Sequence, residues 1–362
     1  MLSARGKIST RQLFIICIVA IYSPIVRLSP SLAAKYAAHA GWISYLVSAL
    51  IFIPMLYLLQ SAFNKGNCSN LSELFEKSVG KITTKCIMII YLIWLMILLA
   101  LYTRYYASRL IVSIKPGANL SLISSLLLIV VFFGIKAGFE AFARLAEVFF
   151  SVFLIIFVVL FALLFNSIDY NNLYPVTHHD FIPILKGTYP VLGIWGYIIY
   201  AFFLGDYVND KENIKYIGLQ ATAFSTVIGL MLVLLTIGVF NASVIERSTL
   251  PFFSAVKSAS VLKTIERMES VLVAMWVFSD YYIISLFVFI IQNVLKSVFS
   301  LTDTKSLTSP LLLFAFVFSL YFALGYFELS AFSEKIGIAM NILTCFIIPA
   351  ILIGIGKIRK TI

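Results

Sequence analysis

Charged side chains are scarce in this sequence, and their scarcity excludes a soluble protein. Only 12% of the 362 residues are Asp, Glu, Lys or Arg, whereas 61% are hydrophobic. A soluble domain carries about 25% charged residues, so a chain this apolar could not cover its surface with polar groups. Apolar runs long enough to cross a bilayer, about 20 residues, recur along the whole length. We therefore predict an integral membrane protein in which residues 1–362 form a single domain.

Side chains suited to catalysis or metal binding are also few. The chain has three histidines, and the run of His178, His179 and Asp180 lacks the helical spacing that places metal ligands on one face. Its four cysteines show no CxxC motif and no paired spacing. The motifs GxSxG and HExxH and a phosphate-binding glycine loop are missing from the sequence. We predict no enzyme activity, no metal and no cofactor.

The net charge of +11 is explained by membrane topology. Lys and Arg lie mostly in short loops between apolar runs, as the positive-inside rule describes, so the predicted partner is the lipid bilayer and not nucleic acid. With the N-terminus inside, the inner loops hold about twice as many Lys and Arg residues as the outer loops, which predicts that both termini are cytoplasmic. The ten predicted spans are 12–30, 42–60, 84–112, 119–135, 145–166, 189–205, 216–240, 270–296, 309–327 and 336–356.

Two spans contain residues that interrupt helices. Pro24 in the first span lacks an amide donor and clashes with the preceding turn. Gly193 and Gly196 follow Pro190 in the sixth span and weaken that helix. Interrupted spans at corresponding positions of two halves indicate a transporter binding site, although ordinary kinks and small-residue packing give the same pattern. The residues predicted to line a central ligand pocket here are Ser23, Pro24, Ile25, Gly193, Trp195, Gly196 and Tyr197.

Two charged residues inside spans are further ligand candidates. Asp280 lies about ten residues into the eighth span, where an acid needs a partner or a cavity. Arg27 lies near the outer end of the first span, where it either binds ligand or reaches toward the interface. A zwitterionic ligand could place its amine at Asp280 and its carboxylate at Arg27. The alternative is a direct Asp280–Arg27 pair that only stabilises the fold.

The other charged residues near the spans are predicted to form structural ion pairs. Arg104 is expected to face the bundle and Arg109 to approach the outer interface. Arg144 and Glu147 are three residues apart on a helix and can pair. The stretch 242–269 is moderately apolar and predicts a short interfacial helix on the outer side. The predicted structural group is Arg104, Arg144, Glu147, Glu266 and Arg267.

Several short motifs in a fixed order resemble one known family. The most specific is IERMES at 265–270 followed by MWV at 275–277. Others are ISTRQLF at 8–14, RYYA at 104–107, ARLAE at 143–147 and NLYPV at 172–176. With these motifs and its ten predicted spans, the sequence resembles the B-subunits of bacterial spore germinant receptors, a branch of the amino acid-polyamine-organocation transporter superfamily.

The resemblance implies an all-α polytopic membrane protein with a five-plus-five inverted-repeat (LeuT-like) bundle, broken helices one and six, and a pocket between spans one, three, six and eight. It implies assembly with an A-subunit and a C-subunit in the spore inner membrane, where a small nutrient such as an amino acid triggers germination. A secondary transporter of amino acids or related solutes is the alternative. Ser23 and Ile25 stand where the family usually has glycines, and Ile198 and Ser108 stand where it often has acids, which permits a more apolar or differently charged nutrient.

Overall fold

The computed structural model describes residues 7–114, 116–260 and 268–362. Within these ranges the chain is helical apart from loops and one isolated bridge between Ile8 and Val208. Eight helical segments are long and apolar enough to span a membrane. They are α1 (Thr10–Ala37), α2 (Ile43–Gly66), α4 (Lys81–Ser113), α6 (Phe139–Phe165), α7 (Phe181–Tyr200), α8 (Ile214–Phe240), α11 (Met268–Phe299) and the run Tyr326–Ile358. The run comprises α13 (Tyr326–Phe332), α14 (Ile338–Ile342) and α15 (Ile348–Ile358), joined by two π-helical turns.

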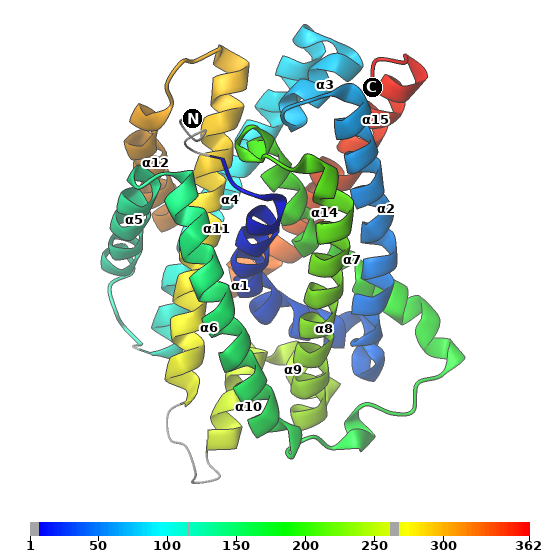
Figure 1. Cartoon of the computed structure of the whole chain (residues 1–362). Helices are drawn as coiled ribbons and strands as arrows, with labels where there is room; N and C mark the ends of the chain where they lie inside the picture. Colours follow the sequence, from blue (N-terminus) through cyan, green and yellow to red (C-terminus); the bar gives the residue numbers. More distant parts are fainter. Residues whose placement is uncertain (1–6, 115, 261–267) are drawn as a thin grey trace.

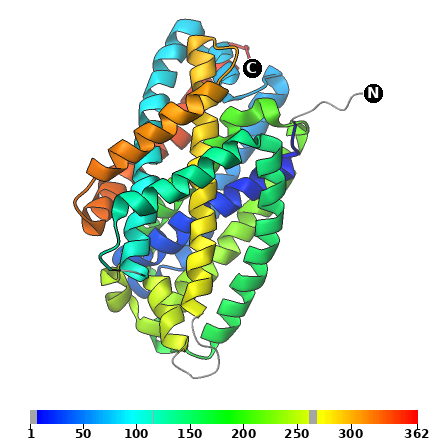
Figure 2. The ribbon, with the colours of Figure 1, turned by 90° about the vertical axis from the view of Figure 1, so that its left-hand side faces the viewer.

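Two shorter apolar helices complete the ten predicted segments. They are α5 (Leu120–Lys136) and α12 (Thr308–Tyr321), which a 3₁₀ turn extends back to Lys305. The two helices pack on each other and lie obliquely to the long α11 (Figure 2). Every predicted span thus coincides with an apolar helical segment, and the all-α polytopic class is confirmed.

The helix α1 lies at the centre of the bundle (Figure 1). It packs against α6, α7, α8 and α11 and is almost entirely buried, as is α7. By contrast, α6 buries little of its apolar surface in the protein, which is the pattern of a helix facing lipid. The first and sixth spans are therefore the two helices most enclosed by the others.

The molecule has two distinct ends. The start of α1, the short α3 (Leu71–Val79) and the end of α15 lie toward one end, the top in Figure 1, which we call the terminal face. The short helices α9 (Ala242–Arg247) and α10 (Pro251–Ser260) lie at the opposite end, the far face. The predicted interfacial segment 242–269 contains these two helices, and its residues 261–267 lie outside the described residues.

A set of polar contacts on the terminal face, which we call the terminal clasp, ties the start of α1 to the loop after α7. The Ile8 amide donates to the Tyr207 carbonyl over 2.7 Å, and the Thr10 amide donates to Asp210 Oδ1 over 2.6 Å. Lys211 Nζ from the same loop donates to the Ser69 carbonyl over 2.5 Å. The first span, the sixth span and the segment before α3 are thereby joined at this end.

The predicted break in the first span is absent, because another helix repairs it. The helix α1 runs continuously through Pro24. The Ser279 hydroxyl of α11 accepts a hydrogen bond from the Ser23 amide over 2.8 Å. The same hydroxyl donates to the Val19 carbonyl over 2.7 Å and to the Ala20 carbonyl over 3.2 Å. Proline at position 24 leaves the Ala20 carbonyl without its helical donor. The inserted hydroxyl supplies the missing hydrogen bond and keeps the helix intact.

The predicted break in the sixth span is also absent. The helix α7 is continuous through Gly193 and Gly196 and changes to a 3₁₀ helix only at Ala201. Both glycines face the last span: a Cβ at Gly193 would lie 2.8 Å from Ile338 Cγ2, and one at Gly196 would lie 3.1 Å from Cys345. The small residues allow two helices to approach closely, so the packing alternative accounts for them and they do not open a pocket.

We predict that Gly196→Leu destabilises the protein by disrupting this contact. The new side chain would displace the last span, and overpacking of this kind costs about 1–3 kcal/mol or more. Thermal unfolding of the purified full chain should show the loss. The control is Gly354→Leu on α15, because no atom of the described residues lies within 4 Å of a Cβ placed there. Equal unfolding temperatures for the two variants would contradict the assignment.

Candidate functional site

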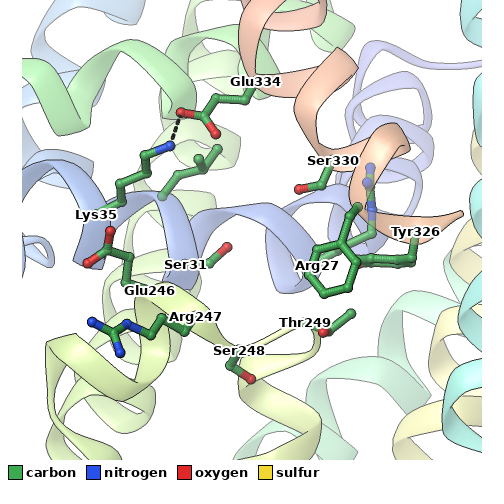
Figure 3. Close-up of a pocket in the computed structure, with 12 residues that line it drawn as sticks. Arg27, Ser31, Lys35, Glu246, Arg247, Ser248, Thr249, Tyr326, Ser330 and Glu334 are labelled. Carbon is green, nitrogen blue, oxygen red and sulfur yellow. Dashed lines mark hydrogen bonds and ion pairs between the residues drawn. The ribbon is translucent and has the colours of Figure 1, made fainter.

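A small pocket of about 360 Å³ lies toward the far face between three parts of the chain (Figure 3). Its volume is at the lower end of the roughly 300–1,000 Å³ found for small-molecule sites. The segments that form it are α1, the connection from α9 to α10, and the α13 region of the last span. Its lining residues are Arg27, Ser31, Leu32, Lys35, Glu246, Arg247, Ser248, Thr249, Tyr326, Phe327, Ser330 and Glu334.

Arg27 is the most buried charged group of this pocket, with 3% of its surface exposed. Its guanidinium carbon lies 3.2 Å from the ring centroid of Tyr105 and 5.6 Å from that of Tyr102, both on α4. The aromatic faces attract the cation. The Nε and Nη1 atoms nevertheless have no hydrogen-bond partner among the described residues. A buried arginine without a carboxylate partner favours binding of an anionic group beside it.

The remaining charges line the rim. Lys35 Nζ forms an ion pair with Glu334 Oε1 at 2.6 Å, and the Tyr36 hydroxyl donates to the same oxygen over 2.8 Å. In Figure 3 this pair and Arg27 lie at opposite ends of the pocket. Glu246 and Arg247 are exposed and form no ion pair within the described part of the chain.

A second polar group, the Asp280 cluster, consists of Ser23, Arg109 and Asp280. Arg109 Nη2 forms an ion pair with Asp280 Oδ2 and donates to Ser23 Oγ over 2.9 Å, while Ser23 Oγ donates to Asp280 Oδ1 over 2.5 Å. Both charged residues are 1% exposed. Along α1, Ser23 is one turn, about 5–6 Å, nearer the terminal face than Arg27. The cluster joins α1, α4 and α11 at one buried point.

This cluster corrects two sequence-based expectations. The partner of Asp280 is Arg109, not Arg27, and both oxygens of the carboxylate are occupied by protein donors. A ligand amine at Asp280 is therefore excluded in this arrangement. Arg109, which was expected near the outer interface, is fully buried and lies over Trp276 at 4.7 Å. The rotation of α4 about its axis decides this, because Arg104 and Arg109 are five residues apart and face different neighbours.

The other predicted pocket residues separate into two groups. Tyr197 lies near Arg27, because its hydroxyl accepts a hydrogen bond over 2.9 Å from Tyr102, the ring beside the Arg27 guanidinium. Pro24 lies in the part of α1 where the Ser279 hydroxyl supplies the missing hydrogen bond. Ile25 lines a narrow void beside α6 and α8 instead. Trp195 packs on Phe52 of α2 with ring centroids 5.3 Å apart. Gly193 and Gly196 face the last span, as described above.

The predicted structural ion pairs are only partly as expected. Arg144 pairs with Glu140 at 3.0 Å and not with Glu147, which accepts from Gln12 of α1 over 3.1 Å. The helix places Glu140 four residues before Arg144 on the same face, while Glu147 turns toward α1. Arg104 forms no ion pair within the described ranges; it donates to the Ala323 carbonyl over 2.7 Å, just beyond the C-terminal end of α12. Glu266 and Arg267 lie outside the described residues.

Sequence reasoning missed several residues that form these sites. Tyr102, Tyr105 and Arg109 are spaced i, i+3 and i+7, which places them on one helix face and could have identified that face as functional. Ser279 carries no signal in the sequence, because its role depends on a proline 255 positions away. The residues of α9 and α13 at the rim are far apart in the sequence, and only the folded structure brings them together.

Comparisons with known proteins agree with this architecture. A family model described as Spore germination protein matches residues 7–327. The chain is 22% identical to Spore germination protein KB of Bacillus subtilis over 347 residues, covering 95% of this chain and 91% of that protein. It is 26% identical to Spore germination protein XB of Bacillus anthracis over 272 residues, covering 71% and 73%.

Similar solved structures are transporters. A Na⁺-coupled sialic acid symporter matches with a TM-score of 0.64 at 10% identity, over 94% of this chain and 80% of that one. The nucleobase-cation-symport-1 family transporter MHP1 matches with a TM-score of 0.64 at 12% identity, over 97% and 78%. At these identities the likeness shows a shared LeuT-like fold.

Proposed function

The chain belongs to the spore germination protein family, and from this membership we propose that it is the B-subunit of a nutrient germinant receptor. In this proposal a small nutrient binds in the pocket at Arg27 and triggers germination. The observation that carries the proposal is a buried arginine with unsatisfied donors at a pocket of small-molecule size. The transporter-like fold supports it, since such folds bind solutes between their central helices.

A ligand in this pocket can change how closely α1, the connection from α9 to α10 and the last span lie to one another. Arg27 comes from α1, Thr249 from the far-face connection and Tyr326 from the last span, so a ligand touching all three favours the arrangement in which they lie closest. The helix α1 also carries the terminal clasp through Thr10 and Asp210 at its other end. We infer that the change in arrangement caused by nutrient binding is transmitted to the terminal face through this helix.

The proposed partners and membrane rest on the family, and the proposed orientation rests on the charge distribution. The partners are the A- and C-subunits of the receptor, and the membrane is the spore inner membrane. The terminal face is assigned to the cytoplasm, which is supported by the excess of Lys and Arg in its loops. The pocket then lies toward the side away from the cytoplasm, from which a nutrient arrives.

A secondary transporter is the second candidate, favoured by the structural neighbours. A solute moving from the pocket to the terminal face would have to pass the Asp280 cluster and the terminal clasp. Breaking a buried ion pair costs several kcal/mol, about 3–5 when one partner is left alone. A receptor that only senses its ligand does not need to break it, so the geometry favours the receptor.

Germination of spores that lack this chain tests the proposal. Spores are exposed to a panel of single nutrients, and the deletion is expected to abolish the response to at least one of them, with full recovery on re-expression. Uptake of the same labelled nutrient into vesicles containing the chain separates the two candidates. Germination unchanged across the panel would overturn the receptor, and uptake that depends on the chain would favour the transporter.

A further inference from the structure

The charges around the pocket are asymmetric. Its lining includes three cationic side chains, Arg27, Lys35 and Arg247, and two acids, Glu246 and Glu334. Lys35 and Glu334 neutralise each other. Arg247 and Glu246 are exposed at the rim, where water weakens their interaction with a ligand. The remaining buried charge is the positive one of Arg27.

The acids near the pocket are poorly placed to receive an ammonium group. Asp280 is 1% exposed and accepts from Arg109 and Ser23. Glu334 accepts from Lys35 and Tyr36. Glu246 lies on the exposed rim. An amine of a bound ligand would therefore meet water or the rim, and not a buried carboxylate.

The stacking of Arg27 on a tyrosine leaves donors of its guanidinium without a protein partner among the described residues. A guanidinium is planar, with its donors directed outward in the plane and its faces free to stack. Tyr105 lies over the face at 3.2 Å, while Nε and Nη1 have no partner in the described part of the chain. Stacking and binding of a carboxylate use different parts of the group, so both can occur together.

We propose that this pocket selects its ligand by a carboxylate held at Arg27, and that an amino group on the ligand is dispensable. The inference rests on the proposed function of the pocket as the nutrient site and narrows its substrate class to small organic acids, with or without an amine. Tyr326, Phe327 and Leu32 line the pocket and offer apolar contacts to the rest of such a molecule.

The test uses matched ligand triplets and the purified full chain in lipid nanodiscs. The triplets are alanine, lactate and alaninamide; leucine, 2-hydroxy-4-methylpentanoate and leucinamide; and phenylalanine, phenyllactate and phenylalaninamide. Within each triplet the amine or the carboxylate is lost in turn. Affinity is read from the ligand-dependent rise in unfolding temperature. In at least one triplet we expect the hydroxy acid to bind within about tenfold of the amino acid and the amide to bind roughly 10- to 150-fold more weakly, the range for a hydrogen bond to a charged group.

Variants assign the preference to Arg27. Arg27→Gln should reduce the difference between acid and amide to less than about threefold, and Arg27→Lys should restore part of it because the charge returns. The matched control is Arg144→Gln, which removes an exposed cation that does not line the pocket and should preserve the preference. An amide that binds as well as its acid, a hydroxy acid that fails where the amino acid binds, or no binding to the wild type at tens of millimolar would each overturn the inference.

The germination experiment separates this inference from the proposed function. A chain that binds carboxylates through Arg27, in spores whose germination does not depend on it, would overturn the receptor and leave the anion preference intact. A deletion that abolishes a nutrient response, combined with equal binding of acid and amide, would overturn the anion preference alone.

Discussion

Replacing Asp280 with asparagine is expected to remove most of the folded protein from the membrane, although the two side chains have nearly the same shape. The change leaves Arg109 charged, 1% exposed and without its carboxylate partner. Removing one member of a buried ion pair costs about 3–5 kcal/mol, which is a large part of the roughly 5–15 kcal/mol that stabilises a typical folded protein. The amount of monodisperse protein extracted from membranes, and its unfolding temperature, measure the effect.

Neutralising both partners should reverse most of the loss. The double variant Asp280→Asn with Arg109→Gln leaves no unpaired charge in the Asp280 cluster, so its abundance is expected to approach that of the wild type. Arg27→Gln is the matched control, because it removes a buried arginine that has no carboxylate partner within the described residues. Normal abundance of the single Asp280→Asn variant would show that the cluster does not stabilise the fold, and would reopen a ligand role for Asp280.

Replacing Ser279 with alanine is expected to destabilise the protein as strongly, although the change deletes one oxygen atom. Without the hydroxyl, the Ser23 amide and the carbonyls of Val19 and Ala20 lose the atom that serves them in a buried part of α1. Each unsatisfied buried group costs about 1–3 kcal/mol. The expected result is a clearly lower unfolding temperature and local opening of α1, which hydrogen exchange of the full chain would report near residue 23.

The proline at position 24 provides an internal test of this explanation. In a Pro24→Ala background the new amide can bond to the Ala20 carbonyl, so Ser279→Ala should then cost less than it does in the wild type. Ser124→Ala on α5 is the control, since Ser124 is equally buried and its hydroxyl has no hydrogen-bond partner in the described part of the chain. The same loss of stability in both backgrounds would contradict a repair role for Ser279.

The fold class could be predicted from sequence because it depends on local properties. A run of apolar residues must cross the bilayer as a helix whatever its neighbours are, and this placed all ten segments. The family resemblance supplied the arrangement of the bundle. Helix continuity was predicted wrongly, since the effect of Pro24 is local whereas its correction by Ser279 comes from another helix. The close contact of Gly196 with Cys345 is likewise visible only in the fold.

The site was predicted in part for a related physical reason. Burial of Asp280 and Arg27 follows from their depth in apolar spans, and both are buried. The choice of partner depends on how each helix is rotated, and a rotation that turned Arg109 inward paired it with Asp280. The sequence therefore predicted the burial of both charges, whereas the alternative that pairs them with each other is wrong.

The two apolar segments that are shorter than the eight long spans have a consequence for the surrounding lipid. The segments Leu120–Lys136 and Lys305–Tyr321 each have 17 residues, which corresponds to about 25 Å at 1.5 Å per residue. Their oblique course shortens the reach across the bilayer further (Figure 2), whereas a typical hydrocarbon core is about 30 Å thick. The acyl chains beside α5 and α12 must compress to match them, at a fraction of a kcal/mol per Å. The bilayer is therefore expected to be thinner on the side of the protein formed by α5 and α12, and lipids with shorter or more disordered acyl chains are the preferred neighbours there.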